Sequence, residues 1–287
     1  MKEKLTLVIK GFLIGVANII PGVSGGTLAI TLGIYEKLIG AISHFFSNLK
    51  KNICFLIPIA IGMLLAIASL SRVIDYSYKH FPIPTSLFFV GLVLGGIPML
   101  VGKVRGKKEV KQASSYVIFA LTFLLVMVMA CSGFIFGEGL KVSFANMGLV
   151  QYLLLFIVGV VAAATMVIPG VSGSLVLMLL GYYYPVLTVI KECTKLQNLG
   201  SNIIILGVFG VGVLLGIVLI SKLIEFLFQK YETKTYFGVL GFIVASVLAI
   251  PISTLLSIKV TFSVIQILIG IVFLVIGSII SYKLGGE

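Results

Sequence analysis

The sequence of 287 residues contains no tryptophan, three cysteines, two histidines and only 10% charged residues. A soluble domain carries roughly a quarter charged residues, so this shortage of charge excludes an ordinary soluble fold. Cys54, Cys131 and Cys193 are odd in number and lack CxxC or CxxH spacing, and His44 and His80 have no partner at a ligand-like spacing. We therefore predict no disulfide framework, no metal site and no cofactor.

Apolar residues dominate the chain instead. Hydrophobic residues make up 60% of it, and the mean hydropathy is +1.23. Crossing the hydrocarbon core takes about 20 apolar residues. Uncharged runs of about that length or longer recur at Gly11–Tyr35, Ile53–Ser71, Phe81–Gly102, Gln112–Gly137, Val142–Ile190, Leu196–Ser221, Thr235–Ile258 and Val260–Tyr282. The sequence therefore predicts an all-α integral membrane protein with several spans.

The formal net charge of +12 comes from 21 Lys and Arg against nine Asp and Glu. These basic residues lie in short loops between the apolar runs, and no single domain gathers them on one face. Membrane topology explains them better than a nucleic-acid partner does. The sequence leaves the oligomeric state open, and the expected environment is membrane lipid.

The chain is an internal duplication. The hexapeptide Ile-Pro-Gly-Val-Ser-Gly at Ile20–Gly25 returns unchanged at Ile168–Gly173. Further residues match in two registers: Gly11 with Gly159, Gly33 with Gly181, Tyr35 with Tyr183, Gly62 with Gly212, Arg72 with Lys222, Asp75 with Glu225 and Gly91 with Gly241. Each half should hold one motif segment and three spans. We predict a first repeat at 1–140, with motif 11–46 and spans about 53–71, 83–102 and 113–136, and a second at 141–287, with motif 146–190 and spans about 202–221, 235–251 and 261–282.

The positive-inside rule distinguishes two topologies. If each motif segment enters and leaves on one side, the N-terminus, 37–51, 103–111, 222–234 and Lys283 share a side that holds 15 Lys and Arg against 6. If each motif segment crosses once, the same residues divide 10 against 11. The clear bias favours two re-entrant broken-helix hairpins and cytoplasmic termini. Three spans then separate the motif copies, which predicts inverted repeats, a layout common in secondary transporters.

The motif has the chemistry of an anion site. Pro21 and Pro169 should end the incoming helices, and Ser24 and Ser172 are good N-caps for the outgoing ones. Glycines after the caps would leave backbone N–H groups uncovered at a helix N-terminus. The predicted substrate-binding set is Asn18, Gly22, Ser24, Gly25, Gly26, Thr27, Gly170, Ser172, Gly173 and Ser174. The alternative is that the glycines only let membrane helices pack closely.

The charged residues near the motifs can have two different roles. Arg72 and Lys222 each stand three residues before a carboxylate, Asp75 or Glu225, so each pair can form an ion pair along a helix. Alternatively, the two cations guide the anion into the site, and we include them in the binding set. Glu36 follows the first motif and could face the cavity, although Tyr184 holds the matching position. Glu36, Asp75 and Glu225 are the candidates for ion coupling.

The stretch Ala17–Thr27, followed by Gly33–Glu36 and the second copy through Ser174, resembles the bacterial polyprenyl-phosphate transporter family called PopT. The resemblance covers essentially the whole chain. It implies translocation of undecaprenyl phosphate, the carrier lipid of cell-wall synthesis, from the outer to the inner leaflet of the bacterial cytoplasmic membrane. It also implies that the protein is not an enzyme. Moving an anion inward against the membrane potential costs about 2.3 kcal/mol per charge per 100 mV, so we expect coupling to a proton or sodium gradient.

Two other functions stay open at this point. A permease for a small soluble anion could use the same motif, and a lateral opening to lipid would distinguish the two. An integral-membrane lipid phosphatase would bind the same head group but needs a nucleophile or base beside cationic clamps, or a metal cluster. A purely structural scaffold gives no reason to duplicate a broken helix.

Overall fold

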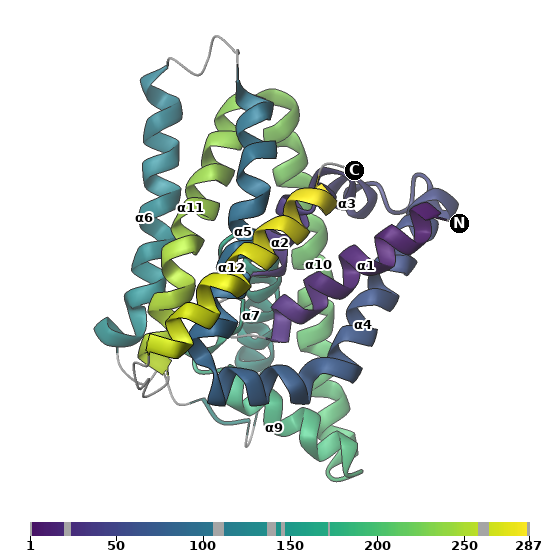
Figure 1. The fold of residues 1–287 in the computed structure, drawn as a ribbon. Helices are drawn as coiled ribbons and strands as arrows, with labels where there is room; N and C mark the ends of the chain where they lie inside the picture. The colour runs from purple at the N-terminus through teal and green to yellow at the C-terminus, as the bar shows by residue number, and fades with distance from the viewer. Residues whose placement is uncertain are drawn as a thin grey trace.

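The structure, a computed structural model, describes residues 2–19, 24–105, 112–136, 142–144, 147–171, 173–257 and 264–285. Within these residues it is all-helical and has no strand (Figure 1). The twelve helices described are α1 (Lys2–Ile19), α2 (Gly25–Thr31), α3 (Tyr35–Ser43), α4 (Leu49–His80), α5 (Pro82–Val104), α6 (Ala113–Phe136), α7 (Leu149–Val167), α8 (Gly173–Leu179), α9 (Tyr183–Thr194), α10 (Leu199–Lys230), α11 (Glu232–Ser257) and α12 (Val264–Gly285).

Helix lengths repeat in the same order in the two halves. α2 and α8 have seven residues each, and α4 and α10 have 32 each. In Figure 1, α1 runs from the N-terminus toward the centre of the molecule, and the labels of both chain ends lie toward the upper right. In the same view, α9 is at the bottom.

Seven of the described helices are long and apolar enough to cross a membrane. Six of them coincide with the six spans predicted from the sequence, and the seventh is α7, which the sequence assigns to the second re-entrant segment. With 19 residues, α7 is about 28 Å long, close to the roughly 30 Å hydrocarbon core. Its length is compatible with a full crossing as well as with a re-entrant arm. α1 has the same place in the first half but carries four charged residues.

Of the four most extensive helix pairs, two lie within a half and two join the halves. α1 packs along α4 and α7 along α10, while α5 packs on α12 and α6 on α11, so the halves exchange their last helices. Gly91 and Gly241, which match in the two repeats, lie where α5 crosses α12 and where α11 crosses α6. A Cβ at Gly91 would be 2.1 Å from the Leu274 carbonyl oxygen, and a Cβ at Gly241 would be 2.4 Å from the Phe119 carbonyl oxygen. At these positions, close helix packing is the reason for glycine.

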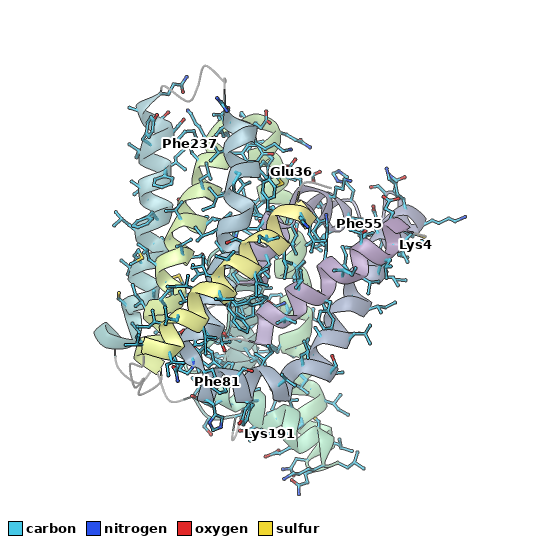
Figure 2. All side chains as sticks on the ribbon, viewed as in Figure 1. Lys4, Glu36, Phe55, Phe81, Lys191 and Phe237 are labelled. Carbon is cyan, nitrogen blue, oxygen red and sulfur yellow. The ribbon has the colours of Figure 1, made fainter. Side chains whose placement is uncertain are left out.

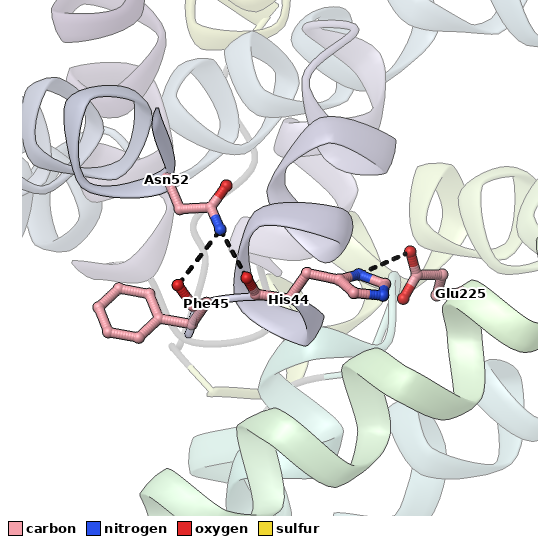
Figure 3. A network of polar contacts seen from close by, with 4 residues as sticks. All are labelled: His44, Phe45, Asn52 and Glu225. Atoms are coloured by element: carbon pink, nitrogen blue, oxygen red, sulfur yellow. Dashed lines mark hydrogen bonds and ion pairs between the residues drawn. The ribbon is translucent and has the colours of Figure 1, made fainter. Parts of the chain in front are cut away.

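Two buried asparagines at matching positions fasten the motif hairpins to the long helices. The Asn52 side chain donates hydrogen bonds to the carbonyl oxygens of His44 at 2.7 Å and Phe45 at 3.4 Å (Figure 3). Asn202 donates instead to the Glu192 carboxylate at 2.9 Å and to the Gln197 carbonyl oxygen at 3.2 Å. Each bond ties the turn after a motif segment to the first residues of α4 or α10.

Candidate functional site

The two motif copies meet in the interior. The backbone N–H of Gly170 donates a hydrogen bond of 2.6 Å to the hydroxyl oxygen of Thr27, which is 1% exposed. Gly170 has a φ of +75°, and a Cβ there would lie 2.9 Å from the Phe242 carbonyl oxygen, so only glycine fits this turn without strain. The structure thus brings together residues 143 apart that the sequence predicts to share a site.

A second contact reinforces this junction. The hydroxyl of Tyr35 donates to the carbonyl oxygen of Val167 at 3.0 Å, at the end of α7. A Cβ at Gly26 would lie 2.9 Å from the same carbonyl oxygen. The hairpin of α2 and α3 therefore lies directly against the C-terminal end of α7, and a side chain at position 26 would separate them.

Ser24 has the position of an N-cap but not its hydrogen bond. Its backbone is extended, with φ −98° and ψ 125°, yet its side chain makes no capping bond to α2. The hydroxyl oxygen is buried and has no hydrogen-bond partner among the described residues. A buried polar group without a partner is costly, so its retention calls for an explanation. The predicted N-cap position of Ser24 is confirmed, but the predicted capping hydrogen bond is absent. The Ser24 hydroxyl is therefore available as a donor at the junction.

The glycines that follow the caps have packing roles that the anion-site prediction did not include. A Cβ at Gly25 would lie 2.5 Å from Asn18 Oδ1, and one at Gly173 would lie 2.4 Å from Met166 Cγ. The outgoing helices α2 and α8 are only about two turns long, so their dipoles contribute less than a long helix would. An anion bound here would therefore depend more on hydrogen bonds from side chains than on the helix dipoles. Asn18 is exposed and Ser174 is half-buried.

The structure does not describe Gly22 and Ser172, nor the side chains of Arg72 and Asp75. In the described part of the chain, Lys222 makes no ion pair with Glu225, so the ion-pair alternative does not hold in the second repeat. Glu225 instead pairs with Nδ1 of His44 at 3.2 Å (Figure 3). Lys222 is exposed on α10. No spacing in the sequence indicates this role for His44, because its partner Glu225 belongs to the other half of the chain.

Glu36 is held by residues of two other helices. Lys103 of α5 lies 3.3 Å from its carboxylate, and the hydroxyl of Tyr236 of α11 donates to it. The Glu36 label lies in the upper part of Figure 2, on the side of the molecule where α3 lies in Figure 1. Glu36, Glu225 and Glu232 line one cavity of about 280 Å³. Two of the three predicted coupling residues therefore share a cavity, with a third carboxylate that the sequence did not single out.

Together these features define a multi-pass helical membrane protein in which Thr27 of the first motif copy and Gly170 of the second meet at a buried junction. Duplicated halves that meet in the interior are an arrangement of the kind that transporters use. The chain belongs to the family described as "VCA0040-like: Undecaprenyl phosphate translocase-like", which matches residues 14–267. The family expected from the motifs is confirmed.

Two curated relatives support the assignment. The chain is 36% identical to a "Polyprenyl-phosphate transporter" of Staphylococcus aureus (strain NCTC 8325 / PS 47) over 282 residues, 97% of this chain and 95% of that protein. It is 30% identical to a "Polyprenyl-phosphate transporter" of Vibrio cholerae serotype O1 (strain ATCC 39315 / El Tor Inaba N16961) over 245 residues, 80% of this chain and 72% of that protein. No solved structure matches the chain.

Proposed function

We propose that the protein translocates undecaprenyl phosphate across the bacterial cytoplasmic membrane, from the outer to the inner leaflet, without a chemical step. The observation that carries this proposal is the hydrogen bond between Gly170 and Thr27, which joins both motif copies in a member of this family. Transfer of a bare phosphate through hydrocarbon costs tens of kcal/mol, whereas the isoprenoid tail can stay in lipid. The protein therefore has to shield the head group alone.

The head-group site in this proposal lies at the junction. The hydroxyl of Ser24 is the strongest donor candidate, because it is buried and no described residue bonds it. Thr27 is buried beside the second motif copy, and Asn18 lies next to Gly25. Arg72 and Lys222 serve as entry cations from opposite faces, as the repeat symmetry suggests.

The topology in this proposal has inverted repeats with both termini in the cytoplasm. The 15-to-6 division of Lys and Arg supports it, as does the shared direction of the two chain ends in Figure 1. Labelling of a single cysteine placed in loop 103–111 tests it in intact cells. An impermeant reagent should fail to reach this loop until the cells are opened, and labelling in intact cells would contradict the topology.

Coupling to a proton or sodium gradient completes the proposal. Inward movement of a phosphate works against an inside-negative potential, so a co-transported cation offsets part of the cost. Glu36, Asp75 and Glu225 are the candidate coupling residues. Support comes from the cavity that Glu36 and Glu225 share, where a cation would be surrounded by carboxylates.

Leaflet-resolved transport of a labelled polyprenyl phosphate in proteoliposomes tests the function. We expect the wild-type protein to move the lipid and Thr27→Val to lose at least about tenfold in rate, because the Gly170 N–H loses its acceptor. Thr31→Val is the matched control: Thr31 is equally buried on the same helix, and its hydroxyl bonds only to the carbonyl oxygen of Leu28.

Two further readouts separate the alternatives. Uptake of inorganic phosphate at the rate of the lipid would indicate a soluble-anion permease. Release of free phosphate from the lipid would indicate a phosphatase. Translocation of intact lipid with neither of these outcomes is the result that the proposal requires.

A further inference from the structure

A cavity of about 520 Å³ lies beside the second motif copy, between α6, α10 and α11. Its volume falls within the roughly 300–1,000 Å³ typical of small-molecule sites. Ile118 of α6, Leu223 and Leu227 of α10 and the pair Ile168–Pro169 are among the residues that line it. The lining is largely apolar, so the cavity suits a hydrocarbon chain and would not retain a free soluble anion.

The cavity connects the junction to one end of the molecule. Ile168 and Pro169 line it directly before Gly170, whose N–H contacts Thr27. Along α11, the lining extends from Phe242 back to Tyr231 just before the helix, a distance of about 16 Å at 1.5 Å per residue. A chain lying in the cavity would therefore have one end next to the motif and the other near the start of α11.

The cavity is also open toward the surrounding lipid. Leu223 and Tyr231 line it, yet they are 51% and 44% exposed. Leu223 lies in a helix long and apolar enough to span the membrane, where exposed leucine faces lipid rather than water. A lipid tail can enter from the side without passing through water, which is the lateral opening that distinguishes a lipid substrate from a soluble anion.

One cation stands at the end of this cavity near the start of α11. Lys234 is the only charged side chain among the described residues that line it. Within the described part of the chain, Lys234 has no carboxylate partner and no hydrogen bond. An apolar groove with one unpaired cation at its end complements an amphiphile that has a hydrocarbon chain and an anionic head. A neutral lipid would leave the cation without a partner.

We propose that this groove binds the substrate lipid, with the isoprenoid units nearest the head group along α10 and α11 and the phosphate at Lys234. This inference rests on the proposed function and names a binding position for its substrate outside the motif junction. Repeat symmetry could not predict it, because Pro84 holds the position that matches Lys234.

Because the chain has no tryptophan, a single introduced one is a specific fluorescent reporter of the groove. Leu223→Trp places it in the groove, and Leu214→Trp is the matched control, since Leu214 is an exposed leucine on the same helix that does not line the cavity. Each detergent-solubilised variant is titrated with polyprenyl phosphate, with the corresponding polyprenol and with inorganic phosphate. Lys234→Gln is then added to each reporter.

We expect polyprenyl phosphate to change the emission of the Leu223→Trp reporter saturably and to leave the Leu214→Trp reporter unchanged. Lys234→Gln should weaken the apparent affinity for polyprenyl phosphate about five- to tenfold, as the loss of one partly exposed charge-assisted contact predicts. Polyprenol should bind more weakly and should not respond to Lys234→Gln. Inorganic phosphate should change neither reporter.

Equal responses of the two reporters, or an affinity that does not depend on Lys234, would overturn the inference. The binding assay does not depend on transport, so the two proposals can fail separately. Saturable binding at the groove without any lipid translocation by the wild-type protein would support the groove and refute the proposed function. Translocation without a response at position 223 would refute the groove alone.

Discussion

The hydroxyl of Tyr35 donates a hydrogen bond of 3.0 Å to the carbonyl oxygen of Val167, so the first turn of α3 is fastened to the last turn of α7. Tyr35 is 4% exposed. Its repeat counterpart, Tyr183, packs its ring against Tyr184 with centroids 5.3 Å apart. The pair of Tyr35 and Val167 therefore links the two halves at a point where their internal symmetry is broken.

Tyr35→Phe should lower stability, because it removes this buried hydrogen bond and keeps the ring. The expected loss is about 1 kcal/mol, which corresponds to a fall of about 2–4 °C in Tm. Thermal unfolding in detergent measures it. Tyr183→Phe is the control and should change Tm by less than about 1 °C. Equal shifts for the two variants would show that the contact with Val167 adds nothing.

The matched asparagines predict a difference in pH dependence. Asn202, and then Asn198, donate to the Glu192 carboxylate and hold its pKa below the ordinary value of 4.5. A lowered folded-state pKa adds stability at pH values above the ordinary one, and this stability is lost as pH falls through the folded-state pKa. The Tm difference between wild type and Asn202→Ala should therefore shrink in acid. Asn52→Ala should lower Tm by an amount nearly independent of pH, since Asn52 bonds two backbone carbonyl groups.

Periodicity and composition locate the apolar part of each long helix well, but they locate the ends of the helices poorly. The span predicted at 113–136 coincides with α6 (Ala113–Phe136). The span predicted at 53–71 lies inside α4, which begins at Leu49 and ends at His80. Charged residues end an apolar run but do not end a helix, because a helix can continue into the interface with its side chains in water. Hydropathy therefore identifies the residues that lie in the hydrocarbon core of the membrane, but it does not identify the residues at which the helices begin and end.

Duplication predicts that the two motif copies meet, but not the contacts that break the symmetry. The repeated hexapeptide indicated that both motif copies belong to one site, and Gly170 and Thr27 do meet. Repeat matching had no means of finding Lys103 and Tyr236 around Glu36, because Tyr184 replaces Glu36 in the second repeat. These contacts join helices far apart in the sequence, and no spacing rule encodes them.

Ser24→Ala should separate binding from folding. The Ser24 hydroxyl is buried without a partner among the described residues, so its removal breaks no internal hydrogen bond and should leave Tm unchanged or raise it by a few degrees. Lipid transport should fall about tenfold if the hydroxyl donates to the phosphate. Ser86→Ala is the control: Ser86 is equally buried but donates to the Ile83 carbonyl oxygen, so its loss should lower Tm slightly and spare transport. Normal transport by Ser24→Ala would remove Ser24 from the proposed head-group site.

Among the candidate coupling residues whose side chains the structure describes, Glu36 contacts the most helices, and the proposed proton coupling predicts a role for it. Its carboxylate contacts Lys103 and Tyr236, so it links α3 to α5 and α11. It shares a cavity with Glu225 and Glu232, and a proton bound there would reduce the repulsion among these carboxylates. Protonation would also weaken the contact with Lys103. In the proposed coupling, proton binding would therefore change the contacts that join these helices.

Glu36→Gln should abolish the dependence of transport on a pH gradient, because the amide keeps the shape of the side chain but cannot exchange a proton. The measurement is leaflet-resolved lipid transport in proteoliposomes with an imposed pH gradient, a sodium gradient or neither. In the wild-type protein, we expect an inward proton gradient to accelerate inward transport. In Glu36→Gln, the rate of lipid transport with a pH gradient should equal the rate in vesicles without an ion gradient. Movement of lipid down its own concentration gradient should continue. Glu3→Gln, on the exposed start of α1, should behave like wild type. A sodium gradient that replaces the proton gradient in the wild-type protein would make the coupling ion sodium, and a Glu36→Gln protein that still responds to pH would place the proton site elsewhere.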